Sequence, residues 1–191
     1  MTTNHIAAHI GISPGNLYYW YADKSEIVRA LWVRFAAERS TLWEFDEVLP
    51  GPDELVERVV AGTVALGERY AFLTRELHAL VHADAALGAL HVADRSRRLG
   101  ILTTVVRSWW ADGLLTVAGD TASADLVRAL WVLTEHWYAD TAAVGRPDVA
   151  DARRLLRAVL EPLRGTPSGQ GLGSVGFPLT TGQGFPSGTA R

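Results

Sequence analysis

ISPGNLYYWYADKSE, residues 12–26, places four aromatic side chains in a row directly after the signals for a helix start. Ser13 is a favoured N-cap residue, and Pro14 suits the first helical position because its missing N–H needs no partner there. Leu17 and Tyr21 are four residues apart and supply the inward face of a short helix. The remaining side chains point away from the core or along its edge: Asn16, Tyr18, Tyr19 and Trp20.

The residues before and after this stretch predict a helix-turn-helix followed by a third helix. A short helix is expected from Thr3 to His9, with Thr2 or Thr3 as its N-cap, and Gly11 ends it where the chain needs a positive φ. Ala7 is small enough to let the two short helices cross closely. A third helix follows Asp23 or Ser25, with an apolar stripe of Ile27, Val28, Leu31, Trp32 and Phe35.

Exposed aromatic residues beside an amide suit a surface that enters the major groove of DNA. Tyrosine hydroxyls bind phosphates, Asn reads the edge of adenine, and flat rings contact the methyl group of thymine. The alternative from spacing alone is a helical corner whose aromatic residues pack on a neighbouring domain.

Composition limits the class of protein. The chain has 191 residues, enough for one domain of moderate size plus a small appendage. It contains no cysteine, no charged leader before an apolar run and no apolar stretch of membrane-spanning length, so we expect a cytoplasmic protein that is not inserted in a membrane. The formal net charge is −3, so any nucleic-acid surface must be local.

The rest of the chain predicts an all-α fold. One apolar face recurs from Leu55 to Leu77, which predicts a helix of about seven turns that Asp53 can cap. Three further helical runs are expected, from near Leu87 to a C-cap at Gly113, from Ser123 to Gly145, and from Pro147 to Leu163.

The expected organisation has three parts: a helix-turn-helix domain over 1–40, a larger helical ligand-binding and dimerisation domain over 41–164, and a disordered tail over 165–191. The tail holds eight of the eighteen glycines and has no helical or strand period. A docking peptide that uses Phe177 and Phe185 is the alternative interpretation of the tail.

The run IAAHIGISPGNLYYWYADKSEIVRAL, residues 6–31, resembles the DNA-binding core of the tetracycline-repressor-like (TetR) family of transcriptional regulators. The resemblance covers roughly Thr3 to Trp32, and a weaker one covers residues 69–90. It implies backbone-phosphate contacts by Thr3 and Ser13, base contacts by Asn16 and Tyr19, and phosphate or sugar contacts by Tyr18 and Lys24. Gly15 matches the glycine of the motif. Trp20 and Tyr21 depart from it, since the family usually has His and Phe there.

The family also has an amphipathic helix before this motif, whereas this sequence begins at Met1, two residues ahead of it. The resemblance is therefore to an N-terminally truncated member. Either the true start lies upstream, or this form has an impaired DNA-binding domain.

A ligand site is expected in the C-terminal domain, where tryptophan and tyrosine are abundant. The candidate lining residues are Tyr70, Phe72, Leu73, Trp109 and Trp131, and Arg107, Glu135 and His136 can each supply a polar contact. The alternative is a solid core. No catalytic residues, cofactor or metal site are expected, although His5 with His9 and His78 with His82 have helical zinc spacing.

These observations predict a non-enzymatic, ligand-responsive repressor. It would act as a homodimer that binds a double-stranded DNA operator and is released by a small apolar or aromatic effector. The helices over Ser123–Gly145 and Pro147–Leu163 would pair with their copies to form the dimer. The alternative function is that of a helical ligand-binding or interaction protein that has lost DNA binding through its truncated N-terminus.

Overall fold

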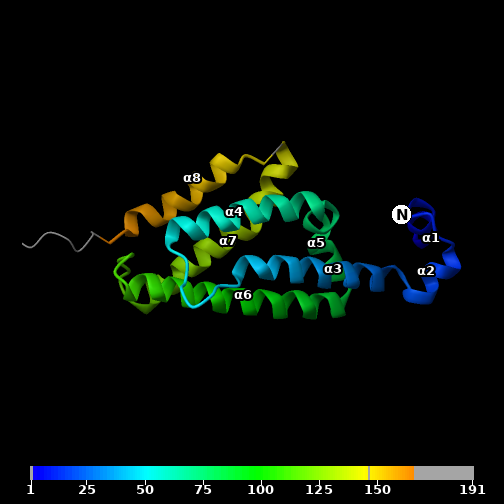
Figure 1. Ribbon diagram of the computed structural model, residues 1–191, viewed down its shortest axis with the longest axis horizontal. Coiled ribbons are helices and arrows are strands. Elements are labelled where there is room, and N and C mark those ends of the chain that lie inside the picture. The colour runs from blue at the N-terminus through cyan, green and yellow to red at the C-terminus, as the bar shows by residue number, and fades with distance from the viewer. Residues whose placement is uncertain (1, 146, 166–191) are drawn as a thin grey trace, which may run out of the picture.

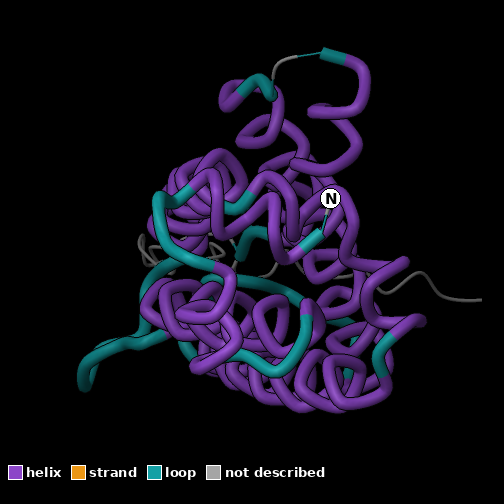
Figure 2. Tube along the Cα trace, turned by 90° about the vertical axis from the view of Figure 1, so that its right-hand side faces the viewer, coloured by secondary structure: helices purple, strands orange, loops and turns teal. Residues whose placement is uncertain are grey.

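The structure is a computed structural model that describes residues 2–145 and 147–165. Within those residues the secondary structure is helical and contains no strand (Figure 2), which confirms the expected all-α fold. One isolated antiparallel bridge joins Leu115 to Arg164. The tail expected from 165 onward lies outside the described residues except for Gly165, whose N–H donates to the carbonyl of Leu114 at 3.0 Å.

Eight α-helices and two short 3₁₀ turns make up the described chain. The helices are α1 (Thr3–His9), α2 (Pro14–Trp20), α3 (Lys24–Ser40), α4 (Pro52–Arg69), α5 (Ala71–Ala83), α6 (Ala85–Ala111), α7 (Asp120–Val144) and α8 (Val149–Leu160), and the turns are η1 (Thr41–Trp43) and η2 (Glu161–Leu163).

Local capping determines several of these boundaries. The Asp84 carboxylate accepts from the N–H groups of Ala86 and Leu87 at the start of α6. Gly113 has φ +71 just after the end of α6, as the sequence predicted. Asp148 caps α8 in the same way as Asp84 caps α6.

The prediction of one seven-turn helix after Asp53 is wrong. The chain breaks at Tyr70, with φ −113 and ψ 34, so that α4 ends and α5 starts in a new direction. The Tyr70 hydroxyl donates to Glu38 on α3 at 2.7 Å, and the ring is buried. The apolar periodicity continues through the break because Leu66 at the end of α4 and Leu73 and Leu77 on α5 pack in the same cluster. Asp53 is not the cap either; Gly51 occupies that position and Asp53 lies in the first turn.

Two apolar clusters form the core. The larger lies among α4, α6, α7 and α8 and is centred on side chains such as Val60, Leu102, Trp109 and Leu160. The second joins α3 to α5 and α6 through Val28, Trp32, Phe35, Tyr70, Leu73 and Leu87. We call α3 to α8 together the helical body.

The first two helices stand apart from the helical body. Figure 1 shows α1 and α2 at one end of the molecule, beyond the start of α3, which runs along α6 below α4. Only Ala7 in α1 and Leu17 in α2 are buried, and they lie where these two helices pack on each other. We call α1 and α2 the helix pair. Because α3 follows the helix pair directly and packs into the helical body, any shift of α3 moves the pair.

The length and apolarity that a membrane crossing requires are not met by any helix in the described part of the chain.

Candidate nucleic-acid interface and ligand cavity

The turn between α1 and α2 has the geometry of a tight helix-turn-helix. Gly11 has φ +73, and the N–H of Ile12 reaches back to the carbonyl of Ala7 at 3.0 Å. Ala7 has no exposed surface, so a small residue is needed where the helices cross. The bounds predicted for α1 and the start of α2 are confirmed.

The start of α2 is built as the sequence predicted. The Ser13 hydroxyl oxygen accepts from the N–H of Asn16 at 3.1 Å, and Pro14 occupies the first turn. A β-carbon added at Gly15 would meet no atom within 4 Å, so this position lies open to an approaching partner. The start of α2 therefore presents backbone and small side chains to the outside.

The side chains expected to face outward do so. The exposed fractions of Tyr18, Tyr19 and Trp20 are 49%, 79% and 70%, and Asn16 is also exposed. The rings of Tyr19 and Trp20 meet edge to face at 5.0 Å. The Tyr18 hydroxyl lies 2.7 Å from the Thr3 hydroxyl, which brings two residues from different helices together.

The start of α3 adds a further residue of the predicted interface. Asp23 caps α3 by accepting from the N–H of Glu26 at 2.9 Å, and the Glu26 carboxylate accepts from the N–H of Ala22. These two hydrogen bonds together hold the bend between α2 and α3. Lys24 is the first residue of α3 and is exposed.

An ion pair connects the first part of α3 to the helical body. Arg29 donates to Asp84 at 2.6 Å, and Asp84 also caps α6. The N–H of Leu87 and, less strongly, the Arg29 guanidinium hold the pKa of Asp84 below its ordinary value although burial opposes this. The carboxylate therefore ties α3 to the start of α6.

The structure reveals a buried cluster of four charges that the sequence interpretation missed. We call Arg39, Asp94, Arg98 and Glu135 the charge quartet. Arg39 donates to Asp94 at 2.5 Å, and its other contact is with Glu135 at 3.4 Å. Arg98 donates to Asp94 at 2.9 Å and to both oxygens of Glu135. The quartet thus joins α3, α6 and α7.

Burial opposes ionisation of the charge quartet, and the ion pairs within it favour ionisation. Arg98 has no exposed surface and Arg39 is 9% exposed. Burial raises the pKa of Glu135, but Arg98 and Arg39 outweigh it and hold that pKa below its ordinary value. The same opposition lowers the pKa of Asp94. Both acids are therefore ionised at neutral pH, and the four charges sum to zero.

Aromatic rings surround the two guanidinium groups. Arg98 lies over the Trp131 ring at 4.5 Å, and Arg39 lies over the Phe35 ring at 4.5 Å and the Trp32 ring at 5.3 Å. Such contacts stabilise a desolvated cation. One signal in the sequence could have revealed Arg39, because it continues the buried stripe of Val28, Trp32 and Phe35 at helical spacing.

The five expected ligand residues do not surround a single cavity. Leu73 is buried beside Tyr70. Phe72 is 39% exposed. Trp109 is buried and its indole N–H donates to the carbonyl of Pro50 at 2.7 Å. The Trp131 ring packs against the Arg98 guanidinium.

A cavity of about 70 Å³ lies beside the charge quartet, between α3, α4, α5 and α7. We call it cavity A. Its polar lining residues are Arg39 and Glu135, together with Thr63, Thr74 and Thr134. The apolar wall is formed by Phe35, Leu66, Gly67, Leu73, Leu77, Tyr138 and Ala139.

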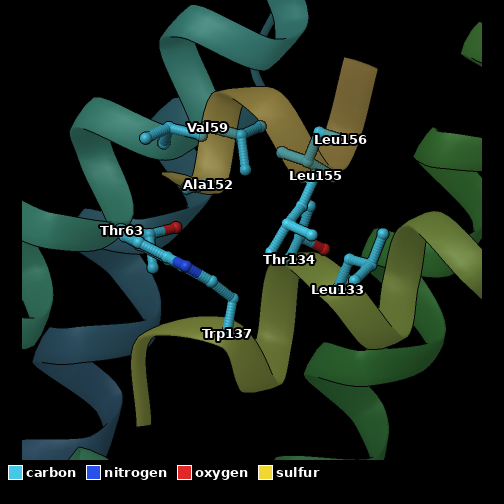
Figure 3. A pocket seen from close by; sticks show the side chains of 9 residues that line it. Val59, Thr63, Leu133, Thr134, Trp137, Ala152, Leu155 and Leu156 are labelled. Carbon is cyan, nitrogen blue, oxygen red and sulfur yellow. The ribbon is translucent and has the colours of Figure 1, made fainter. Parts of the chain in front are cut away.

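A smaller cavity, cavity B, adjoins it between α4, α7 and α8 and has a volume of about 10 Å³. Figure 3 shows its lining, with Trp137 extending from α7 toward Thr63 on α4. Thr63 and Thr134 line both cavities. The remaining lining of cavity B is apolar: Val59, Val60, Leu133, Ala152, Leu155 and Leu156.

The two helices expected to form a dimer bury most of their apolar residues within one chain. Leu126, Val127, Leu130 and Trp131 on α7 belong to the core, as do Leu156 and Leu160 on α8. Exposed apolar side chains remain, namely Val132 at 48% and Val144 at 87% on α7 and Leu155 at 37% on α8. These residues offer apolar surface on α7 and α8 to a partner.

The histidine pairs make other contacts. The ring of His78 stacks on that of His136 at 5.9 Å, and His82 Nδ1 lies 2.7 Å from the carbonyl oxygen of His78. Across the residues that the structure describes, no group of three or more His, Cys, Asp or Glu side chains is placed to hold a metal ion.

Comparison with known proteins supports the fold. No protein-family model and no curated protein matches the chain. A solved structure of a TetR-family transcriptional regulator from Marinobacter aquaeolei VT8 superimposes with a TM-score of 0.74 at 22% identity, over 87% of this chain and 82% of that one. A Rhodococcus sp. protein described as a TetR-family transcriptional regulator gives a TM-score of 0.62 at 18% identity, over 85% and 87%. The chain therefore has the TetR-like fold.

Proposed function

We propose that this chain is a ligand-responsive, DNA-binding transcriptional regulator of the repressor type, and that it is not an enzyme. The observation that carries this proposal is the helix pair itself: α2 stands at one end of the molecule with Asn16, Tyr18, Tyr19 and Trp20 exposed. A short helix with an exposed amide and exposed rings fits the width of the major groove. The likeness in fold to TetR-family regulators supports the same assignment.

In this proposal each predicted interface residue has a stated role. Asn16 and Tyr19 contact base edges, with Trp20 beside them. Thr3, Ser13, Gly15 and Tyr18 face the phosphate backbone. Lys24 supplies a positive charge to a phosphate at the start of α3.

The test begins with selection of a binding sequence from random double-stranded DNA, followed by fluorescence anisotropy at several salt concentrations. Tyr19→Ala should weaken binding to the selected sequence about tenfold, since a good base contact contributes roughly 1–3 kcal/mol of discrimination. Lys24→Ala should weaken binding to all sequences alike and flatten the salt dependence.

Arg75→Ala is the matched control for Lys24→Ala, because Arg75 is an exposed cation on α5, outside the helix pair. It should change neither affinity nor salt dependence. If selection enriches no sequence, or if Tyr19→Ala binds the enriched sequence as the parent does, the DNA-binding assignment is refuted.

The ligand half of the proposal rests on cavity A and its position. Arg39 lines this cavity and belongs to α3, the helix that follows the helix pair. A small apolar or aromatic effector that enlarges the cavity shifts α3 against α7 and so changes the spacing of two recognition helices in a dimer. Operators are read by helices one DNA turn apart, so this shift lowers DNA affinity.

We propose a homodimer through the outer faces of α7 and α8. The neighbouring residues Leu155 and Leu156 provide a matched test, because Leu155 is 37% exposed and Leu156 is 6% exposed. Leu155→Glu should yield a folded monomer in sedimentation at micromolar concentration. Leu156→Glu should unfold the protein, since it places a charge in the core. A monomeric parent protein would refute the dimer.

One observation favours a second function, that of a helical ligand-binding or interaction protein that does not bind DNA. The helix pair buries only Ala7 and Leu17 and leaves Ile10 56% exposed. An apolar residue exposed on a two-helix unit suits contact with another protein. Ligand binding without any selected DNA sequence would support this function.

A further inference from the structure

Four buried side-chain nitrogen atoms in the helical body have no hydrogen-bond partner: Arg39 Nε, His91 Nδ1, Trp137 Nε1 and Arg153 Nε. Two of them belong to residues that line cavities A and B, namely Arg39 on α3 and Trp137 on α7. Both residues are about nine-tenths buried, with 9% of each exposed. Buried N–H groups in folded proteins almost always have an acceptor, so an unpartnered one requires an explanation.

Each of these two donors belongs to a residue that lines one of the two adjoining cavities. Arg39 lines cavity A, and Trp137 lines cavity B. The two cavities share Thr63 on α4 and Thr134 on α7. In Figure 3 the Trp137 ring extends toward Thr63, a residue that lines both cavities. One elongated molecule placed across this boundary would therefore come close to both donors.

The Glu135 carboxylate, the charged acceptor at the cavities, is already engaged. The two oxygens of Glu135 accept from Arg98, and Arg39 NH1 approaches one of them. The Thr134 hydroxyl donates to the carbonyl of Leu130 at 2.9 Å. The buried nitrogen donors at the cavities that lack an acceptor are Arg39 Nε and Trp137 Nε1, and the rest of the lining is hydroxyl or apolar.

We propose that cavities A and B together bind one neutral molecule that has an apolar body and two carbonyl oxygens, as in a diketone, diester or quinone. One oxygen accepts from Arg39 Nε and the other from Trp137 Nε1. This inference rests on the ligand half of the proposed function and specifies the chemical class of the effector.

The charge quartet explains why the molecule is neutral. Arg39 and Arg98 balance Asp94 and Glu135 at close range. A carboxylate in cavity A would add an uncompensated negative charge beside Glu135, which a buried site does not tolerate. A carbonyl oxygen satisfies the donor and leaves the balance unchanged.

The ligand must also widen the site. Cavity A has about 70 Å³ and cavity B about 10 Å³, which hold only a few water molecules at roughly 10–15 Å³ each. An organic molecule enters only if the helices that carry the two donors move apart. Those helices are α3 and α7, so occupancy acts on the element that carries the helix pair.

The experiment uses three compounds of the same shape: 1,4-diethylbenzene, 4-ethylacetophenone and 1,4-diacetylbenzene. They carry no carbonyl, one carbonyl and two carbonyls. Binding to the full-length chain is measured by two-dimensional ¹H–¹⁵N NMR, which reports the indole N–H of each of the seven tryptophans. The Trp137 signal is identified by its loss in Trp137→Phe.

The variants separate hydrogen bonding from shape. Trp137→Phe keeps an aromatic ring without the donor, and Arg39→Lys keeps the charge without Nε. Each variant should bind 1,4-diacetylbenzene about fivefold more weakly, the effect of one net hydrogen bond. The affinity for 1,4-diethylbenzene should not change. The matched controls are Trp110→Phe and Arg97→Lys, which alter exposed residues outside both cavities and should change nothing.

In the parent protein 1,4-diacetylbenzene should shift the Trp137 indole signal downfield, and 4-acetylbenzoate should bind more weakly. This measurement needs no variant and therefore stands even if Arg39→Lys fails to fold. An unmoved Trp137 signal, equal losses for all three compounds in Trp137→Phe, or tighter binding of 4-acetylbenzoate would each overturn the proposal. Absence of binding by every compound would overturn it as well. None of these results bears on DNA binding, which is measured separately.

Discussion

The helix pair and the helical body of this protein are stabilised in different ways. The body buries two apolar clusters and a charge quartet, contributed by side chains from all of its helices. The helix pair buries Ala7 and Leu17 and exposes Ile10, Tyr19 and Trp20. Buried apolar area contributes roughly 25 cal/mol per Å², so almost all of the stabilisation lies in the body.

This difference shows which properties each region can have. The helix pair depends on caps and a turn glycine, which fix its local conformation but add little stability, so its surface is available for recognition. The body is stabilised by contacts between residues far apart in the sequence, and α3 connects it to the helix pair. The pair should therefore unfold locally while the body stays folded. Four predictions test this contrast.

The largest effect is expected from Trp109→Ala. Trp109 is 1% exposed, and its indole N–H donates to Pro50, so the change leaves a cavity and an unpaired carbonyl. The free energy of unfolding should fall by about 3–5 kcal/mol in urea titration, with the whole body unfolding together. The neighbouring Trp110→Ala is the control, because Trp110 is 38% exposed and should cost much less. Similar losses in the two variants would contradict the assigned core.

A somewhat smaller loss is expected from Glu135→Gln, about 3 kcal/mol, because it leaves Arg98 and Arg39 without a full counter-charge. The ion pairs of Glu135 should also make the stability of the protein depend on pH in the acid range. The folded-state pKa values of Glu135 and Asp94 lie below their ordinary values. Their contribution is therefore complete above the unfolded pKa and is lost as pH falls through the folded pKa, below about pH 4.

The measurement for this second prediction is the midpoint of urea unfolding between pH 7 and pH 3. The parent protein should lose stability in acid more steeply than Glu135→Gln, which lacks one of the two carboxylates. Parallel curves would show that Glu135 titrates alike in the folded and unfolded states.

A local effect is expected from Leu17→Ala in the helix pair. Leu17 is 5% exposed and is the main apolar contact between α1 and α2, so its loss should cost about 2 kcal/mol there. Amide hydrogen exchange in α1 and α2 should then accelerate roughly thirtyfold. Exchange in α6 should not change. Faster exchange in both regions would mean that the pair and the body unfold as one unit.

The smallest effect is expected from Gly11→Ala, about 1 kcal/mol, since φ +73 is strained for any residue with a β-carbon. The added methyl would meet no atom within 4 Å, so strain is its only cost. Gly67→Ala is the comparison in the body, where the new β-carbon would overlap the Tyr138 ring. Hydrogen exchange should show a small loss of stability in Gly11→Ala that is confined to the helix pair. Urea titration should show a larger loss in Gly67→Ala that affects the whole body.

The sequence by itself determined the local structure of the helix pair. Ser13, Pro14 and Gly11 act within four residues of their own positions, so capping and turn rules predicted the bounds of α1 and the start of α2. The outward orientation of Tyr19 and Trp20 followed from the inward positions expected for Leu17 and Tyr21; Leu17 is buried, and Tyr21 is the half-buried residue just after α2. The full set of candidate DNA-contacting residues also needed the resemblance to the TetR motif, and their contacts with DNA remain a prediction.

Only the tertiary structure decided the ends of long elements and the identity of the cavity. The expected seven-turn helix ends at Tyr70, whose hydroxyl donates to Glu38, 32 residues earlier in the chain. Asp94 and Arg98 have a visible four-residue spacing, but their partners lie far away in the sequence, since Glu135 is 37 residues from Arg98 and Arg39 is 55 residues from Asp94. Periodicity gives the face of a helix on which a side chain lies. The face that each helix turns toward another depends on the packing of the whole chain, and that packing placed Arg39 and Trp137 at the cavities and left Phe72 at the surface.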